Sequence, residues 1–223
     1  MREILIADDH PLFRDALKRA LGQAVPDAVL FEADSVASLQ ALVDAHADAE
    51  LLLLDLHMPG ANGFSTLAFM RGQHPGLPVV VVSAQEEPAV IRRAIAHGAS
   101  GYIPKSASVD TIVTAVRRIL EGDVWLPPHF AAPNGALDDD EASAAARIAE
   151  LTPQQFRVLS MIAAGLLNKQ IAFELNVSEA TIKAHMTAIM RKLHVSNRTQ
   201  VALYANHLAL ERPGLAEAHG ARG

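Results

Sequence analysis

The stretch that decides the fold is Leu51-Leu52-Leu53-Leu54-Asp55-Leu56-His57-Met58-Pro59-Gly60-Ala61-Asn62-Gly63. Four consecutive leucines predict a strand that is buried on both faces, which is typical of a parallel sheet. The strand ends in a carboxylate, and the Pro-Gly pair that follows predicts a turn. Ligands of open α/β sheets bind outside the carboxyl ends of the strands, so Asp55 is a candidate site residue. Taken alone, it is equally compatible with a plain turn residue.

Composition places the chain among globular proteins of one or two domains. It has 223 residues, of which 50% are hydrophobic and 20% charged, as in ordinary soluble proteins. It contains no cysteine, which excludes disulfides and thiolate metal sites. No apolar run approaches the roughly 20 residues that a membrane-spanning helix needs, and the first residues do not resemble a signal peptide. We therefore expect a cytoplasmic protein with no membrane partner.

Charge is distributed unevenly along the chain. Residues 1–122 carry 10 basic and 15 acidic side chains, residues 123–148 carry 1 and 5, and residues 149–223 carry 8 and 5. An acidic front, an acidic connector and a basic end predict two domains with different partners. The small positive charge of the last segment favours nucleic acid only weakly.

Short apolar segments alternate with helical patterns through the first half of the chain. The apolar segments predict strands at residues 3–7, 28–31, 51–54, 79–82 and 100–103. Apolar residues at helical spacing between and after them predict five helices, the last of which ends near residue 120. This alternation predicts a doubly wound parallel sheet with helices on both faces. Right-handed crossovers then bring all strand ends to one edge.

Polar residues at the strand ends share that edge: Asp8, Asp9, Asp55, Ser83 and Lys105. Three clustered carboxylates need a compensating cation, and oxygen ligands without Cys or His favour Mg²⁺. A lysine and a hydroxyl suit phosphoryl oxygens. The pattern therefore predicts a carboxylate that accepts a phosphoryl group with metal assistance, although polar residues also end many strands that have no such role.

These residues carry a resemblance to a known family. They resemble, in order, the motifs of the receiver domain of two-component response regulators over residues 2–121: Asp8-Asp9, Asp55-x-x-Met58-Pro59-Gly60, Ser83-Ala84 and Lys105. The resemblance implies the flavodoxin-like strand order 2-1-3-4-5 and a phosphoacceptor role for Asp55, with a sensor histidine kinase as donor. It also implies that Asp9, Asp55 and the backbone carbonyl of His57 bind Mg²⁺ directly, while Asp8 acts mainly through water.

The same resemblance assigns residues to the phosphorylated state. Lys105 would pair with the phosphoryl group, and Ser83 would turn inward to hydrogen-bond it. Tyr102 occupies the family's switch-aromatic position, and its ring would swing inward with Ser83; a plain aromatic residue of an edge strand is the alternative. The side chain of His57 lies where the family varies, and we do not expect it to bind metal.

Residues 122–148 differ from both flanks. Turn-forming Pro and Gly residues and the acidic run 138–141 predict a flexible, solvated linker, with a helix starting within 142–148. The acidic run either docks on the basic end of the chain and inhibits it or serves solubility alone. We therefore expect a receiver domain at 1–121, a linker at 122–148, a second domain at 149–212 and a tail at 213–223.

The second domain is predicted to be all-α. Thr152-Pro153 is typical of a helix start, and Gly165 ends that helix. Helices over 168–175 and 179–193, joined by a turn, form a helix-turn-helix, whose second helix enters the DNA major groove. One side of this helix is apolar, and the other suits either DNA or a plain solvated surface. Its residues are Lys183, Ala184, Thr187 and Arg191.

This segment resembles the four-helix LuxR-type domain over residues 149–211. The resemblance rests on Leu151-Thr152-Pro153, Gly165-Leu166-x-Asn168-Lys169-x-Ile171-Ala172, Ser178-x-x-Thr181-Ile182-Lys183-x-His185, Lys192-Leu193 and Arg198-Thr199-Gln200. It implies that Lys183, Ala184 and Thr187 face the bases. Near the DNA backbone it places Asn168, Lys169 and Arg198. Leu167 and Gln170 depart from the family's frequent Ser and Glu, so no operator sequence carries over.

The last predicted helix, over 199–211, is apolar on two sides. Leu203 and Leu210 lie on one side, and Val201, Tyr204 and Leu208 lie on the other. One side can pack on its own domain. We predict that the side with Val201, Tyr204 and Leu208 joins a second copy, so that a homodimer reads two DNA half-sites.

The whole chain is thus similar to NarL/FixJ-type response regulators. The resemblance implies a cytoplasmic transcription factor, not an enzyme, with Mg²⁺ as cofactor. Its partners would be a sensor histidine kinase, promoter DNA and RNA polymerase. We expect phosphorylation of Asp55 to shift a closed form, in which the recognition helix is masked, toward an open form that dimerises.

Two other classes of protein remain as alternatives. A metal-dependent phosphatase or phosphotransferase could also use clustered aspartates, but it needs a substrate pocket and a second acid or base. A ligand-sensing regulator with the same DNA-binding end needs an apolar pocket in the first domain, which strand-end carboxylates do not suggest.

Overall fold

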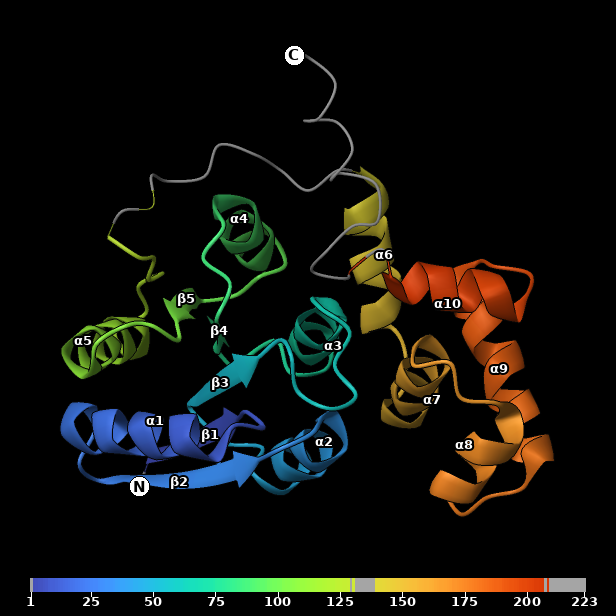
Figure 1. Cartoon of the computed structure of the whole chain (residues 1–223), viewed down its shortest axis with the longest axis horizontal. Helices are drawn as coiled ribbons and strands as arrows, with labels where there is room; N and C mark the ends of the chain where they lie inside the picture. Colours follow the sequence, from blue (N-terminus) through green and yellow to red (C-terminus); the bar gives the residue numbers. More distant parts are fainter. Residues whose placement is uncertain (1, 129, 131–138, 207, 209–223) are drawn as a thin grey trace, which may run out of the picture.

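The computed structural model describes residues 2–128, 130, 139–206 and 208, which form an α/β domain and a helical domain (Figure 1). Three parts of the sequence prediction lie outside these residues: the tail at 213–223, Leu210, and most of the acidic and turn-forming centre of the linker, at 131–138. The α/β domain contains five strands: β1 (Arg2–Ala7), β2 (Ala28–Ala33), β3 (Leu51–Asp55), β4 (Val79–Ser83) and β5 (Gly101–Pro104).

The sheet has the predicted architecture. Its strands pair in the order β2-β1-β3-β4-β5, and every pair is parallel. All residues of β3 and β4 are buried, as the unbroken Leu and Val runs predict for a sheet covered on both faces. Asp55 pairs with Val82 and Ser83 with Pro104, so both polar residues end their strands at the same edge.

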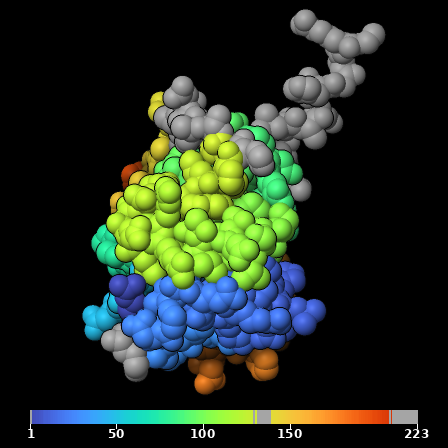
Figure 2. Space-filling view, turned by 90° about the vertical axis from the view of Figure 1, so that its left-hand side faces the viewer, coloured from blue at the N-terminus to red at the C-terminus, as the bar shows by residue number. Residues whose placement is uncertain are grey.

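Helices cover both faces of the sheet and form two separate apolar clusters. On one face, α1 (Pro11–Ala24) packs on α5 (Val109–Leu120), and their side chains form a cluster with the inward residues of the sheet and Trp125. We call this cluster the α1–α5 face. Figure 2 views this side, and blue and yellow-green segments cover most of it.

The other face of the sheet carries α2 (Val36–Ala45), α3 (Ser65–Gln73) and α4 (Pro88–Ala96). Its apolar cluster does not end with the α/β domain, because buried residues of every described helix of the helical domain belong to the same cluster as Leu52 and Leu54. We call this cluster the shared face. Phe69 of α3 stacks on Phe156 of the helical domain, with ring centroids 4.2 Å apart and an interplanar angle of 8°.

The helical domain follows the predicted helix starts. It contains α7 (Pro153–Ala163), α8 (Asn168–Glu174), α9 (Glu179–Leu193) and α10 (Arg198–Asn206). Thr152 and Gln155 form a capping box at the start of α7, and the Ser178 hydroxyl accepts a hydrogen bond from the amide of Thr181 at the start of α9. His194, with φ at 57°, ends α9 in the left-handed conformation.

The predicted linker is structured at both of its described ends, which differs from the flexible, solvated segment we expected. Trp125 is buried and forms a parallel bridge to Gly101 of β5. At the other end, α6 (Asp139–Ala149) begins within the acidic run, before Ala142. Asp139, Asp140 and Glu141 form its first turn, where negative charge is favoured by the helix dipole. In the described residues, no helix is long and apolar enough to span a membrane.

Candidate functional site

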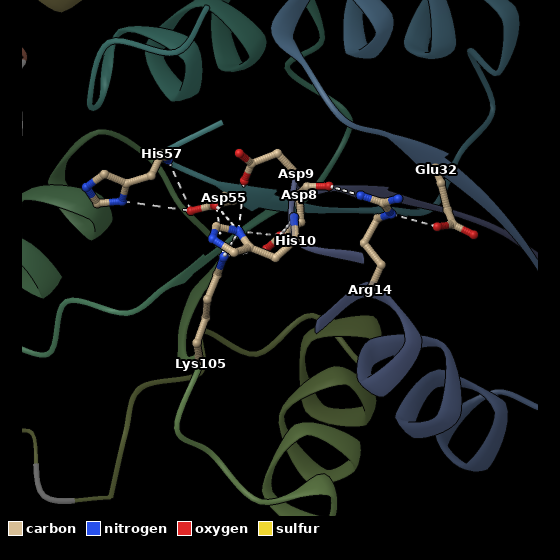
Figure 3. Close-up of polar contacts among 8 residues, drawn as sticks. All are labelled: Asp8, Asp9, His10, Arg14, Glu32, Asp55, His57 and Lys105. Carbon is tan, nitrogen blue, oxygen red and sulfur yellow. Dashed lines mark hydrogen bonds and ion pairs between the residues drawn. The ribbon is translucent and has the colours of Figure 1, made fainter. Parts of the chain in front are cut away.

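Carboxylates from two strand ends meet at the carboxyl edge of the sheet (Figure 3). Asp55 ends β3, and its side chain is completely buried; Asp8 follows β1 and is 1% exposed, whereas Asp9 is 31% exposed. Ligand atoms of these three residues and of His10 all lie within 4.8 Å of one another. The structure therefore brings together the three aspartates predicted from the sequence.

Lys105, which follows β5, reaches the same point. Its Nζ lies 2.7 Å from Asp8 Oδ2 and 2.9 Å from Asp55 Oδ2. Burial of the ammonium lowers its pKa, but hydrogen bonds to Asp8 and Asp55 outweigh this effect and leave the pKa above its ordinary value. The side chain is therefore cationic and compensates part of the carboxylate charge.

The oxygen atoms of the acidic cluster suit a hard divalent cation. Asp8 Oδ2 and Asp9 Oδ1 are both buried, and each lies beside a nitrogen: Lys105 Nζ at 2.7 Å and His10 Nδ1 at 2.8 Å. The amide of His57 donates to Asp55 Oδ1 over 3.1 Å, which places the backbone of residue 57 beside the carboxylate. The ring of His57 lies at the side of the cluster, with its Nδ1 3.9 Å from Asp55 Oδ1 (Figure 3). These residues form an acidic pocket with the chemistry of a metal site.

Ser83 and Tyr102 are both fully buried behind this pocket. The Tyr102 hydroxyl donates to the carbonyl of Gln85 over 2.6 Å, and the Ser83 hydroxyl accepts from the Gln85 amide over 3.2 Å. Burial raises the pKa of Tyr102 to about 12, although its contact with the Ser83 hydroxyl lowers it. We expected the ring to swing inward only with phosphorylation; in this conformation it already lies inside, because its hydroxyl finds a backbone partner there.

Two residues of the site were missed by sequence reasoning. His10 Nδ1 lies 2.8 Å from Asp9 Oδ1 and 3.2 Å from Lys105 Nζ, so the ring sits over the acidic cluster. Arg14 donates to the backbone carbonyl of Asp8 over 2.7 Å and to Glu32 Oε2 over 2.8 Å. The position of His10 directly after Asp8-Asp9 and of Arg14 one helical turn later was the available signal.

The predicted DNA-contacting residues lie on the outside of α8 and α9. Lys183, Ala184, Thr187 and Arg191 are all exposed. Arg198 at the start of α10 donates to Asn168 Oδ1 over 2.9 Å and also to the carbonyl of Leu166, which joins two predicted backbone contacts into one group beside exposed Lys169. The expectation that the closed form masks the recognition helix is not met, because the α/β domain packs on α7 and α10 instead.

The predicted dimer side of α10 is covered by the chain itself. Val201 and Leu208 are fully buried, whereas Leu203, which we expected to pack inward, is 58% exposed. Val201 belongs to the apolar cluster where α10 packs on α7 and α9, so its assignment to a free dimer face is wrong for this conformation. The carbonyl of Leu208 accepts a hydrogen bond from the amide of Phe64 over 2.7 Å, and Tyr204 contacts α6.

Glu141, the last residue of the acidic run, docks on the α/β domain and not on the basic helical domain. Glu141 Oε1 lies 2.7 Å from Arg93 Nε and 2.7 Å from His97 Nε2, at the end of α4. The alternative of docking on the basic end of the chain is therefore wrong for Glu141. Nothing in the sequence pairs these groups, because 48 residues separate Arg93 from Glu141.

The fold and the site together define a two-domain regulator, with an acidic pocket in one domain and a helix-turn-helix in the other. The response regulator receiver domain matches residues 4–117, and the luxR family of bacterial regulatory proteins matches residues 149–205. The chain therefore belongs to the response regulators that join a receiver domain to a LuxR-type DNA-binding domain. Members of this family are transcription regulators and not enzymes, which leaves the phosphatase alternative without support.

Relatives of known name match over nearly the whole chain. The glycerol metabolism activator of Pseudomonas putida is 40% identical over 213 residues, which cover 93% of this chain and 96% of the relative. The nitrate/nitrite response regulator NarL of Escherichia coli K12 is 31% identical over 207 residues, covering 91% and 94%. Among solved structures, the RcsB response regulator of Salmonella typhimurium is similar in fold, with a TM-score of 0.53, 24% identity and coverage of 92% and 98%.

Proposed function

We propose that Asp55 is the phosphoacceptor of this response regulator and that its phosphorylation controls DNA binding by α9. The observation that carries the proposal is the Asp55 carboxylate, which is fully buried at the end of β3 beside Asp8 and 2.9 Å from Lys105. Gathering carboxylates in a buried site is unfavourable unless charge compensates them. Such a cluster is poor at stabilising a fold and is well suited to a chemical role.

In the proposed reaction, an Asp55 oxygen attacks the phosphorus of a phosphohistidine on a sensor histidine kinase. The O–P bond forms as the P–N bond breaks, and the kinase imidazole leaves with the electron pair of that bond. Lys105 is cationic and already lies at Asp55, so its ammonium is placed to neutralise the incoming phosphoryl oxygens. Ser83 would supply a hydroxyl to the same group after a shift from Gln85.

Asp9, Asp55 and the backbone carbonyl of His57 would hold Mg²⁺, and Asp8 would act through water. The oxygen-only donor set and the clustering of the three carboxylates within 4.8 Å support this assignment. The cation would supply charge neutralisation to the phosphoryl oxygens. Because the His10 ring lies over the buried Asp55 carboxylate, with Nδ1 3.9 Å from Asp55 Oδ2, the ring must move aside for a donor to reach it.

The DNA-binding proposal uses the exposed side of the helical domain. Lys183, Ala184 and Thr187 would face the bases, with Arg191 on the same side of α9. Asn168, Lys169 and Arg198 would contact the phosphates, for which exposed cations and amides are suited. A homodimer through Tyr204 and Leu208 would read two half-sites of promoter DNA in the cytoplasm, with RNA polymerase as a further partner. We assign the receiver domain to 1–121, the linker to 122–148, the DNA-binding domain to 149–212 and the tail to 213–223.

The proposal is tested by phosphorylation with acetyl phosphate and Mg²⁺, read by intact mass. Wild type should gain one phosphoryl group and Asp55→Asn none. DNA fragments selected from a random pool by the phosphorylated protein then provide a probe for both forms. Tighter binding by phosphorylated wild type than by Asp55→Asn supports the proposal, and equal binding by the two proteins contradicts it.

A further inference from the structure

A cavity lies between the two domains, where α2 contacts α7 (Figure 1). Its volume is about 290 Å³, which is close to the lower end of the range for small-molecule pockets, and such pockets occur preferentially at domain interfaces. Among the described residues, none that we assigned to phosphorylation or to DNA binding lines this cavity. The cavity is therefore separate from both of those sites.

The receiver-side wall of the cavity is formed by the start of α2 and by the turn that follows β3. The Val36 amide donates to the Pro59 carbonyl over 2.9 Å, and a Cβ atom on Gly60 would lie only 3.3 Å from Val36 Cβ. The Ser35 hydroxyl accepts from the Ser38 amide and caps α2. Contacts within the receiver domain thus hold this wall in place, and its Ser35 hydroxyl already has a partner.

One face of α7 forms most of the opposite wall. The residues of this face recur at helical spacing, and they are Arg157, Ser160, Met161 and Ala164. The Ser160 hydroxyl donates to the carbonyl of Phe156 over 3.1 Å, so it too has a partner. Leu166 and the last residue of α8, Glu174, complete this wall. Apolar side chains therefore line most of the cavity, beside one cation and one carboxylate.

The two charged groups of the cavity, Arg157 and Glu174, make no ion pair with each other or with any other described residue. The Arg157 Nε is also buried, and it donates no hydrogen bond within the described part of the chain. A buried donor without a partner costs free energy, so such a group in a folded protein calls for an explanation. A ligand that pairs with both charges would supply it.

The two charges restrict the class of ligand. A simple carboxylate would pair with Arg157 but would meet the negative charge of Glu174, and a simple amine would meet the opposite conflict. A molecule that carries an ammonium and a carboxylate on one carbon can pair with both groups. The apolar walls then suit a hydrocarbon side chain on that same carbon.

We propose that this cavity binds a free apolar α-amino acid. Its carboxylate would accept hydrogen bonds from the Arg157 guanidinium, and its ammonium would donate to the Glu174 carboxylate. Its side chain would pack on Val36 and Met161. The inference goes beyond the proposed function and does not depend on phosphorylation. Because the two walls belong to different domains, the bound amino acid would contact both of them.

The test measures binding to the unphosphorylated full-length protein by isothermal titration calorimetry. Free valine, leucine, isoleucine and phenylalanine are the probes, and at least one of them should bind saturably. Each amino acid that binds is compared with the analogue that lacks the ammonium and with the analogue that lacks the carboxylate. For leucine these analogues are isocaproate and isoamylamine. Each analogue leaves one charged group of the cavity unpaired, so its affinity should be lower by about tenfold or more.

Substitutions of the two charged residues should change the ligand preference in opposite ways. Arg157→Gln should weaken binding of the amino acid by about tenfold or more and make its affinity equal to that of the amine. Glu174→Gln should instead make its affinity equal to that of the carboxylate. A loss of structure would weaken all three ligands alike and would not produce these two patterns. Arg92→Gln is the matched control, because Arg92 is an exposed residue of α4 outside the cavity.

A second pair of variants fills the cavity without changing any charge. Ala37 and Ala41 are both exposed residues of α2, but only Ala37 lines the cavity. Ala37→Leu should abolish binding of the amino acid, and Ala41→Leu should leave it unchanged. The proposal is overturned if none of the four amino acids binds saturably or if either analogue binds wild type as tightly as the amino acid does. Wild-type affinity in Ala37→Leu would overturn it as well, since binding would then lie elsewhere.

Discussion

The two faces of the receiver sheet are covered by different parts of the chain. On the α1–α5 face, two helices and Trp125 close a cluster that contains residues of the receiver domain and the adjoining linker start alone. On the shared face, the cluster under α2, α3 and α4 runs on through α6 into the helical domain. One face is therefore a self-contained core, while the other is completed by the partner domain of the same chain.

Because of this difference, substitutions on the two faces should have two kinds of effect. A change on the α1–α5 face should alter the stability of the receiver domain and leave the arrangement of the domains unchanged. A change on the shared face should alter how the domains hold together, because Phe69 stacks on Phe156 and α6 packs on α3. The proposed regulator can then respond to phosphorylation on one side without loosening the core on the other.

Truncation of a side chain buried in the α1–α5 face should have the largest effect on the free energy of unfolding. Leu17 is fully buried there, so Leu17→Ala should lower the free energy of unfolding by about 2–5 kcal/mol. Leu12, on the same helix, is 86% exposed, and Leu12→Ala should change it by less than about 0.5 kcal/mol. Urea titrations followed by Trp125 fluorescence measure both values. Similar losses from the two variants would remove the distinction between core and surface of α1.

The contact between domains should appear as an interaction energy across the shared face. In a double-mutant cycle, Phe69→Ala and Phe156→Ala should be coupled by roughly 0.5–1.5 kcal/mol, because either substitution alone already removes the stacking contact between the two rings. Leu17→Ala and Phe156→Ala belong to different clusters and should be additive within about 0.5 kcal/mol. Additive behaviour of the two phenylalanines would mean that the domains do not share this face in solution.

The effect that is confined to alkaline pH comes from the tyrosines, both of which contact the shared face. Because the pKa of Tyr102 is raised from 10.0 to about 12 in the folded protein, its contribution to stability is complete below pH 10 and is lost as the pH rises toward 12. Denaturation at several alkaline pH values, with tyrosinate absorbance as a second reading, measures this loss. Tyr102→Phe should reduce the loss, and ionisation of Tyr102 near pH 10 in the folded wild type would contradict it.

Much of the receiver domain could be predicted from local patterns. Runs such as Leu51–Leu54 and Val79–Val82 predicted strands buried on both faces, and right-handed crossovers then placed Asp8, Asp55 and Lys105 at one edge. The structure brings these three together. His10 was missed because its place directly after Asp8-Asp9 was the only signal and does not say that the ring folds back over the cluster. The buried Tyr102 ring depends on Gln85, which the sequence does not mark.

The amino-acid sequence by itself determined the strands, the helix starts at Thr152 and Ser178, the strand-end residues and the exposed side of α9. These follow from periodicity, capping and topology, which act over a few residues or through general rules of chain connection. Only the tertiary structure decided where α6 lies, which side of α10 is covered and what Glu141 contacts. Those outcomes depend on the fit of Gly72 to Ala149 and on charges brought together from distant parts of the chain, which local patterns do not encode.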